Sequence, residues 1–209
     1  QNPRRAFIML SSVFFYWGVL TAINSATIPF FRQVFSLSWR DSMLVNVAFY
    51  LAPFVICLPC SGWMARLGYR SALLLALILA ASGSVVIAVS LWLASFAGCL
   101  VGIFIVAMGV AAMQVVANPY VNRLGEAQSA AGRLSLASSI NSLGAALAPV
   151  VLAVVLAGSV ISVPGMYLGL MLVGGILLVA LYRFSIADFR DAHENIFSAI
   201  PALRRYAHF

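Results

Sequence analysis

The sequence contains no lysine and has only five carboxylates among its 209 residues. These carboxylates, Asp41, Glu126, Asp188, Asp191 and Glu194, all fall outside the long apolar stretches of the chain. An acid inside a membrane helix is the usual group by which a proton-driven carrier takes up and releases its proton. The apolar stretches of this chain therefore offer no such group.

Groups that carry enzyme or metal chemistry are also scarce. The two histidines, His193 and His208, lie in the tail, and no carboxylate pair, histidine cluster or activated nucleophile occurs in the apolar part. The cysteines Cys57, Cys60 and Cys99 lie in apolar stretches, so we expect free thiols in helix packing; the CxxC of the first two lacks a soluble thioredoxin-like context. We therefore predict no enzyme, no catalytic residue, no metal site and no cofactor.

The composition indicates an integral membrane protein. The chain is 64% hydrophobic and 8% charged, with a mean hydropathy of +1.06, whereas about half of a soluble domain is apolar. Unbroken runs of about 20 apolar residues predict spanning helices and exclude the weak alternation of a membrane barrel. Six such runs are present: Ala6–Phe31, Met43–Met64, Ser71–Ala94, Gly98–Val121, Leu134–Ala157 and Pro164–Tyr182.

All twelve basic residues are arginines, and most fall on alternate connections between the runs. One side would carry Arg4, Arg5, Arg66, Arg70, Arg123, Arg133, Arg183, Arg190, Arg204 and Arg205. Only Arg32 and Arg40 fall on the other side. The positive-inside rule thus predicts a multi-pass protein of the cell (inner) membrane with both termini cytoplasmic. The net charge of +7 then reflects topology and contact with anionic membrane lipid, and we expect no nucleic acid partner.

The chain divides into a six-helix transmembrane bundle, residues 1–184, and a cytoplasmic interdomain linker, residues 185–209. An asparagine followed by a proline and an arginine occurs in Asn24–Arg32 and again in Asn118–Arg123, which suggests two repeats of three helices. In the linker, Glu194–Tyr206 is predicted to form an interfacial helix, with a binding motif for another protein as the alternative.

Polar residues inside the runs are candidates for a binding site, because polar groups in hydrocarbon must either join helices or line a wet cavity. In the first run, Trp17, Thr21, Asn24 and Ser25 share one helical face. A neutral polyol could stack on the indole and bond to the amide. The alternative is that these groups bond to neighbouring helices.

The fourth run places Gln114 and Asn118 on one face. Pro119 leaves the carbonyl of Val115 without its helical donor, so Asn118 could serve either that kink or a ligand. Gln114 has no such local duty, and we expect it to contact solute.

The second and fifth runs add further candidates. Asn46 has Tyr50 one turn later, and we expect Asn141 to face solvent or substrate. Hydroxyl residues at helical spacing indicate close helix packing, with solute contact as the alternative. The fifth run has four such residues: Ser135, Ser138, Ser139 and Ser142.

Three strings, FFYWGVLTAIN, QVVANPYVNRLG and RLSLASSINSLGAALAP, resemble the first, fourth and fifth helices of the fucose and glucose/galactose permease family within the major facilitator superfamily. The resemblance runs from about Ala6 to the last residue, and the tail resembles the stretch before the seventh helix of a twelve-helix carrier. It implies an all-α fold, the amino-terminal half of a major facilitator fold.

The loop motif that this superfamily carries after its second helix is similar to SGWMARLGYR in this chain. Arg66, Gly68 and Arg70 remain, whereas Ser61 replaces a glycine and Ala65 replaces the acidic residue. The resemblance therefore implies a weakened charge latch between the two halves of the carrier.

The sites depart from the family as well. The resemblance places Ser25 where the proton-coupled fucose carrier has an aspartate, and Gln114 where it has a glutamate. Ser135 and Ser138 stand where relatives have Asn and Gln, and Asn46 stands where they have Gln. Glutamine at the second acidic position is similar to the glucose/galactose branch.

Together these features predict a secondary transporter half for a small neutral polar solute, a monosaccharide, working by alternating access. It would need its missing carboxy-terminal half or a second copy to close the cavity. Two alternatives stay open: a carrier of another polar solute or drug, and a half-length membrane interaction module that does not transport.

Overall fold

The computed structural model describes residues 3–158 and 162–184. These residues form helices and no strand. The helices in chain order are α1 (Pro3–Ala26), α2 (Ile28–Val34), α3 (Trp39–Ser42), α4 (Leu44–Leu67), α5 (Tyr69–Trp92), α6 (Phe96–Arg123), the short 3₁₀ turn η1 (Ala127–Ser129), α7 (Ala130–Leu156) and α8 (Val163–Arg183). The predicted linker, residues 185–209, lies outside the described residues.

Within the described residues, six helical segments are long and apolar enough to cross a membrane, which confirms the predicted all-α membrane fold. Each of the six predicted runs coincides with one of these segments to within a few residues. Only the first predicted run is not one continuous helix in the described residues. It is divided into α1, which ends at Ala26, and α2, which begins at Ile28. Pro29 lacks an N–H, so the Ser25 carbonyl loses its helical donor at this break.

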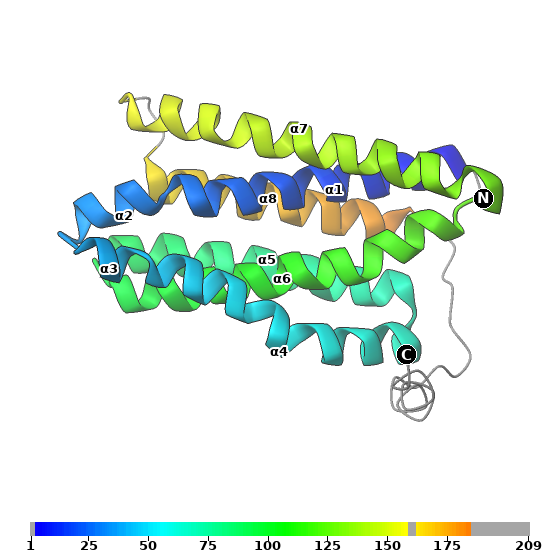
Figure 1. The fold of residues 1–209 in the computed structure, drawn as a ribbon, viewed down its shortest axis with the longest axis horizontal. Helices are drawn as coiled ribbons and strands as arrows, with labels where there is room; N and C mark the ends of the chain where they lie inside the picture. Colours follow the sequence, from blue (N-terminus) through cyan, green and yellow to red (C-terminus); the bar gives the residue numbers. More distant parts are fainter. Residues whose placement is uncertain (1–2, 159–161, 185–209) are drawn as a thin grey trace, which may run out of the picture.

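The helices pack as two layers (Figure 1). One layer runs α7, α1, α6, α4 in spatial order, since α1 packs along α7, α6 packs along α4, and α1 contacts α6. The second layer, α5 and α8, lies behind α6 and α1. The first three spans are α1, α4 and α5, and the last three are α6, α7 and α8. If each span is exchanged for its counterpart in the other set, the α1–α7 pair becomes the α6–α4 pair and the α5–α8 pair stays the same. This is the arrangement expected of two three-helix repeats.

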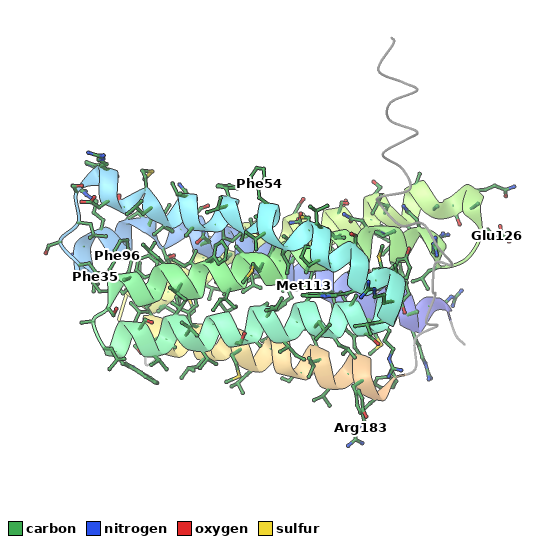
Figure 2. All side chains as sticks on the ribbon, turned by 90° about the horizontal axis from the view of Figure 1, so that it is seen from below. Phe35, Phe54, Phe96, Met113, Glu126 and Arg183 are labelled. Carbon is green, nitrogen blue, oxygen red and sulfur yellow. The ribbon has the colours of Figure 1, made fainter. Side chains whose placement is uncertain are left out.

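Most arginines of the described residues gather at one end of the bundle. The α4–α5 and α6–α7 turns lie at the same end as the start of α1 and the end of α8 (Figure 1). Figure 2 shows Glu126 and Arg183 at this end and Phe35 and Phe96 at the other. Of the arginines that the structure describes, only Arg32 and Arg40 lie at the opposite end, on α2 and α3.

Small residues allow α5 and α6 to pack backbone against backbone. A Cβ added at Gly109 would lie 2.5 Å from the amide nitrogen of Ala80 and 2.8 Å from the carbonyl oxygen of Ala76. Gly83 and Gly102 make equally close approaches across the same pair of helices. Helices in a membrane associate mainly through such close packing, because lipid supplies no hydrophobic driving force between them.

The fold therefore predicts that Gly109→Ala destabilises the protein. The new methyl group would meet backbone atoms that cannot move without separating α5 from α6, so we expect a loss of about 1–3 kcal/mol of unfolding free energy. Thermal unfolding in detergent would show this as a lower melting temperature. Gly175→Ala in α8 is the matched control, because no atom lies within 4 Å of its added Cβ. Equal melting temperatures for the two variants would contradict the packing described here.

Candidate functional site

All eight predicted site residues lie on the layer formed by α7, α1, α6 and α4. Trp17, Asn24 and Ser25 belong to α1, Asn46 to α4, Gln114 and Asn118 to α6, and Ser138 and Asn141 to α7. The structure separates these eight residues into those whose polar atoms are bonded within the bundle and those whose polar atoms are not.

The α1 residues Trp17, Thr21 and Ser25 form a stripe at intervals of four. Trp17 is half-buried and packs against Phe14 with ring centroids 4.4 Å apart, while Ser25 is exposed. The Thr21 hydroxyl donates to the Trp17 carbonyl 2.9 Å away. Thr21 is thus satisfied within its own helix, which leaves the indole and the Ser25 hydroxyl as the groups of this stripe that could meet a solute.

Asn24 lies on a different side of α1. It is 6% exposed, and it lines a small cavity with residues of α5, α6 and α8. The helical periodicity places it beside Ser25, but tertiary packing turns it towards the second layer of helices.

Gln114 and Asn118 are half-buried on α6, one turn apart. Neither amide forms a hydrogen bond with any residue that the structure describes. Asn118 therefore does not bond to the Val115 carbonyl that Pro119 leaves free, although α6 is helical through that proline. Two adjacent amides with unused donors and acceptors can bind a hydroxylated ligand.

On α4, Asn46 is half-buried and Tyr50 is exposed. The contact of the Asn46 amide nitrogen is local and weak, 3.8 Å from the Met43 sulfur. The Tyr50 ring packs edge-on against Phe49, with centroids 5.5 Å apart. Both polar groups remain available to a ligand or to another bundle.

Asn141 joins α7 to α1. Its amide nitrogen donates to the carbonyl oxygen of Phe14 at 2.9 Å. The helices meet closely here, because a Cβ at Gly18 would collide with the Asn141 backbone and one at Gly144 with the Phe15 carbonyl. The amide donor of Asn141 is thus occupied by a helix–helix bond.

The expected close packing of the four α7 serines is wrong for the described bundle. The Ser139 hydroxyl donates to the Ser135 carbonyl at 3.0 Å, and the Ser142 hydroxyl donates to the Ser138 carbonyl at 3.1 Å. All four residues are exposed. The close contacts of α7 with α1 lie instead on the face that carries Asn141 and Gly144.

We predict that Asn141→Ala destabilises the bundle. The variant leaves the Phe14 carbonyl without its side-chain donor, and such bonds in membranes contribute about 0.6 kcal/mol on average and about 1.7 at most. Thermal unfolding measures the loss. Ser139→Ala is the control, because its hydroxyl bonds only within its own exposed turn. An Asn141→Ala protein as stable as this control would show that the bond to Phe14 contributes nothing.

The predicted loop motif lies at the α4–α5 turn. Gly68 joins the two helices with φ 88° and ψ 166°, a conformation open essentially to glycine alone. Arg70 reaches α8, where Nη2 donates to the Tyr182 carbonyl at 2.6 Å and Nε to the Leu181 carbonyl at 3.3 Å. Arg66 is exposed in the last turn of α4. In this half, Arg70 therefore caps α8.

Two tyrosines that join helices were not predicted from the sequence. The Tyr16 hydroxyl donates to the Leu170 carbonyl at 2.9 Å and so connects α1 to α8. The Tyr167 hydroxyl lies 3.4 Å from the hydroxyl of Thr27, at the break between α1 and α2. Each tyrosine lies within an apolar run, and periodicity alone does not distinguish a tyrosine that bonds to a carbonyl from one that fills space.

The family follows from comparison of the whole chain. The sequence profile described as "Major Facilitator Superfamily" matches residues 4–205. The chain belongs to this superfamily.

Two curated relatives show the nearer resemblance. The chain is 38% identical over 150 residues to the glucose/galactose transporter of Brucella abortus biovar 1 (strain 9-941), a match that covers 72% of this chain and 36% of that protein. It is 35% identical over 144 residues to the L-fucose-proton symporter of Escherichia coli (strain K12), covering 69% and 33%. The matched segment spans about a third of the length of these relatives.

Solved structures agree on the fold. A crystal structure of the E. coli fucose:proton symporter matches with a TM-score of 0.80 at 23% identity, over 98% of this chain and 56% of that one. A Major Facilitator Superfamily transporter in the outward conformation matches with a TM-score of 0.78 at 26% identity, over 97% and 55%. The chain thus corresponds to about half of each structure.

Proposed function

We propose that this chain is the amino-terminal half of a sugar transporter. It would bind a small neutral monosaccharide and take part in its transport by alternating access. The observation that carries the proposal is the pair of unbonded amides, Gln114 and Asn118, on the same helix layer as the Trp17 indole. Sugar sites combine an aromatic plate with hydrogen-bonding groups, and this layer offers both. The sugar-transporting relatives support the same solute class.

Within this proposal seven of the eight candidate residues have different roles, and Asn24 is considered separately below. Trp17, Ser25, Gln114 and Asn118 form the solute-binding face, with Asn46 and Ser138 at its edges on α4 and α7. Asn141 holds α7 against α1. Asn141 would contribute to binding indirectly, because it positions the α1 stripe of Trp17, Thr21 and Ser25.

We further propose that this half binds solute without exchanging protons. No aspartate or glutamate lies within α1, α4, α5, α6, α7 or α8. Asp41 and Glu126 lie in α3 and just before η1, both exposed at the ends of the bundle. Ser25 and Gln114, at the positions where we expect a proton-coupled relative to carry acids, cannot titrate near neutral pH.

The protein would lie in the inner membrane with the arginine-rich end of the bundle in the cytoplasm. That end carries Arg4, Arg66, Arg70 and Arg123 on the start of α1 and the two turns beside it. The positive-inside rule supports this orientation, which would make both termini cytoplasmic.

A second bundle would cover the open side of the layer. Of the residues in the most apolar stretch of the α7 segment, 22% are buried within this chain, the same share as in α8 and less than the 61% in α6. The Phe54 side chain of α4, 81% exposed, points away from the bundle (Figure 2). The complementary carboxy-terminal half, or a second copy of this chain, is the proposed occupant.

Uptake by reconstituted protein tests the proposal. The chain, produced together with its complementary half in liposomes, should accumulate or equilibrate a radiolabelled monosaccharide. Gln114→Leu should raise the KM for uptake about 10-fold, equivalent to about 1.4 kcal/mol, because a hydrogen bond to the sugar is lost. Any effect of an imposed proton gradient on sugar uptake should not depend on groups of this half.

The control is Gln128→Leu, which removes an exposed amide at η1 and should not alter KM. No uptake of any monosaccharide, with or without the complementary half, would refute the sugar assignment. Proton dependence that disappears on substitution of a residue within α1 to α8 would refute the absence of proton exchange.

A further inference from the structure

Three buried side-chain atoms have no hydrogen-bond partner within the described part of the chain, Ser11 Oγ, Asn24 Oδ1 and Arg32 Nε, and of these Asn24 Oδ1 lies beside a cavity. Asn24 is 6% exposed, and its Oδ1 has no hydrogen-bond partner within the described part of the chain. A buried amide oxygen left unbonded costs about 1–3 kcal/mol. Such an atom in a folded protein usually has a partner, either another protein group or an ordered water.

A small cavity lies beside this atom. It lies between α1, α5, α6 and α8, is partly open, and is lined by Asn24, Tyr167 and five aliphatic side chains. The cavity leaves about 10 Å³ for the centre of a water-sized sphere, which is room for one water molecule. Its two polar side chains face it from different helices, α1 and α8.

The available hydrogens define how a water would bond. Thr27 has a single hydroxyl hydrogen, and two backbone carbonyls accept from this hydroxyl, that of Ile23 at 2.9 Å and that of Asn24 at 3.1 Å. When that hydrogen is donated to a backbone carbonyl, the Tyr167 hydroxyl is the donor in the Thr27–Tyr167 pair, whose oxygens lie 3.4 Å apart. The Tyr167 oxygen then keeps a lone pair for another donor, and Asn24 Oδ1 needs a donor as well.

We propose that this cavity binds one ordered water molecule, which donates one hydrogen to Asn24 Oδ1 and the other to the Tyr167 hydroxyl oxygen. Two polar partners suffice for a buried water. A metal cation would need about six oxygen ligands, and the lining supplies two side-chain oxygens. Apolar occupants would leave Asn24 Oδ1 unbonded.

The bound water extends the bonding at the α1 break. It connects Asn24 through Tyr167 to Thr27, so that α8 holds α1 where Pro29 interrupts its helical bonds. Asn24 becomes a positioning residue of α1, and its ligand is water instead of solute. This inference is independent of the transported molecule.

Radiolytic hydroxyl labelling of the whole chain in detergent tests it. An ordered water beside a buried side chain is a local source of hydroxyl radical, so Tyr167, 3% exposed, should be labelled faster than Tyr16, 1% exposed. Tyr16 is the matched control, since its hydroxyl bonds directly to the Leu170 carbonyl. Labelling of Tyr167 at the rate of Tyr16 would overturn the proposal.

Asn24→Leu supplies the second measurement. It removes the acceptor and fills the space, so the labelling of Tyr167 should fall to the rate of Tyr16, whereas Ser82→Ala, an exposed change on α5, should leave it unchanged. Fast labelling that persists in Asn24→Leu would overturn the proposal. If this variant does not fold, the comparison of Tyr167 with Tyr16 in the unaltered chain decides by itself.

Discussion

The absence of water from the hydrocarbon core is the constraint on which the rest of this structure depends. Every polar group there must bond within the protein or face a wet surface, since an unbonded one costs free energy. Tyr16, Thr21 and Asn141 satisfy this requirement with carbonyls of the bundle. Gln114 and Asn118 do not satisfy it within the described residues. The same physical rule thus separates the side chains that hold the helices from those that we propose hold a solute.

Close packing by small residues complements this rule. Gly109 against Ala80, and Gly18 against Asn141, bring backbones together where lipid provides no driving force for association. The close α1–α7 and α5–α6 pairs leave α4 and α7 at the two edges of a layer, each with exposed apolar side chains. A layer with an open side is a suitable wall for a cavity that another bundle closes, and this is how the proposed function depends on the fold.

The sequence was sufficient for the six spans, because about 20 uninterrupted apolar residues have few alternatives to a membrane helix. The arginines likewise predicted which connections share an end of the bundle. The orientation of individual polar residues could not be predicted. Periodicity places Asn24 next to Ser25, but which helix packs against each side of α1 depends on tertiary contacts. The α7 serines do not pack within the described bundle for the same reason, since Asn141 and Gly144 form the contact with α1.

Site-directed thiol labelling tests the central claim that the α7–α1–α6–α4 layer is a water-lined solute face. Cysteine would be placed at Gln114 or at Asn141 in a chain with Cys57, Cys60 and Cys99 replaced by serine, assembled with its complementary half. We expect a membrane-impermeant maleimide to modify the thiol at position 114, and a transported monosaccharide, added well above the KM raised by loss of the Gln114 amide, to slow this modification. We expect the thiol at position 141 to react slowly with or without sugar. A thiol at position 114 that no sugar protects, or one that never reacts, would contradict the account.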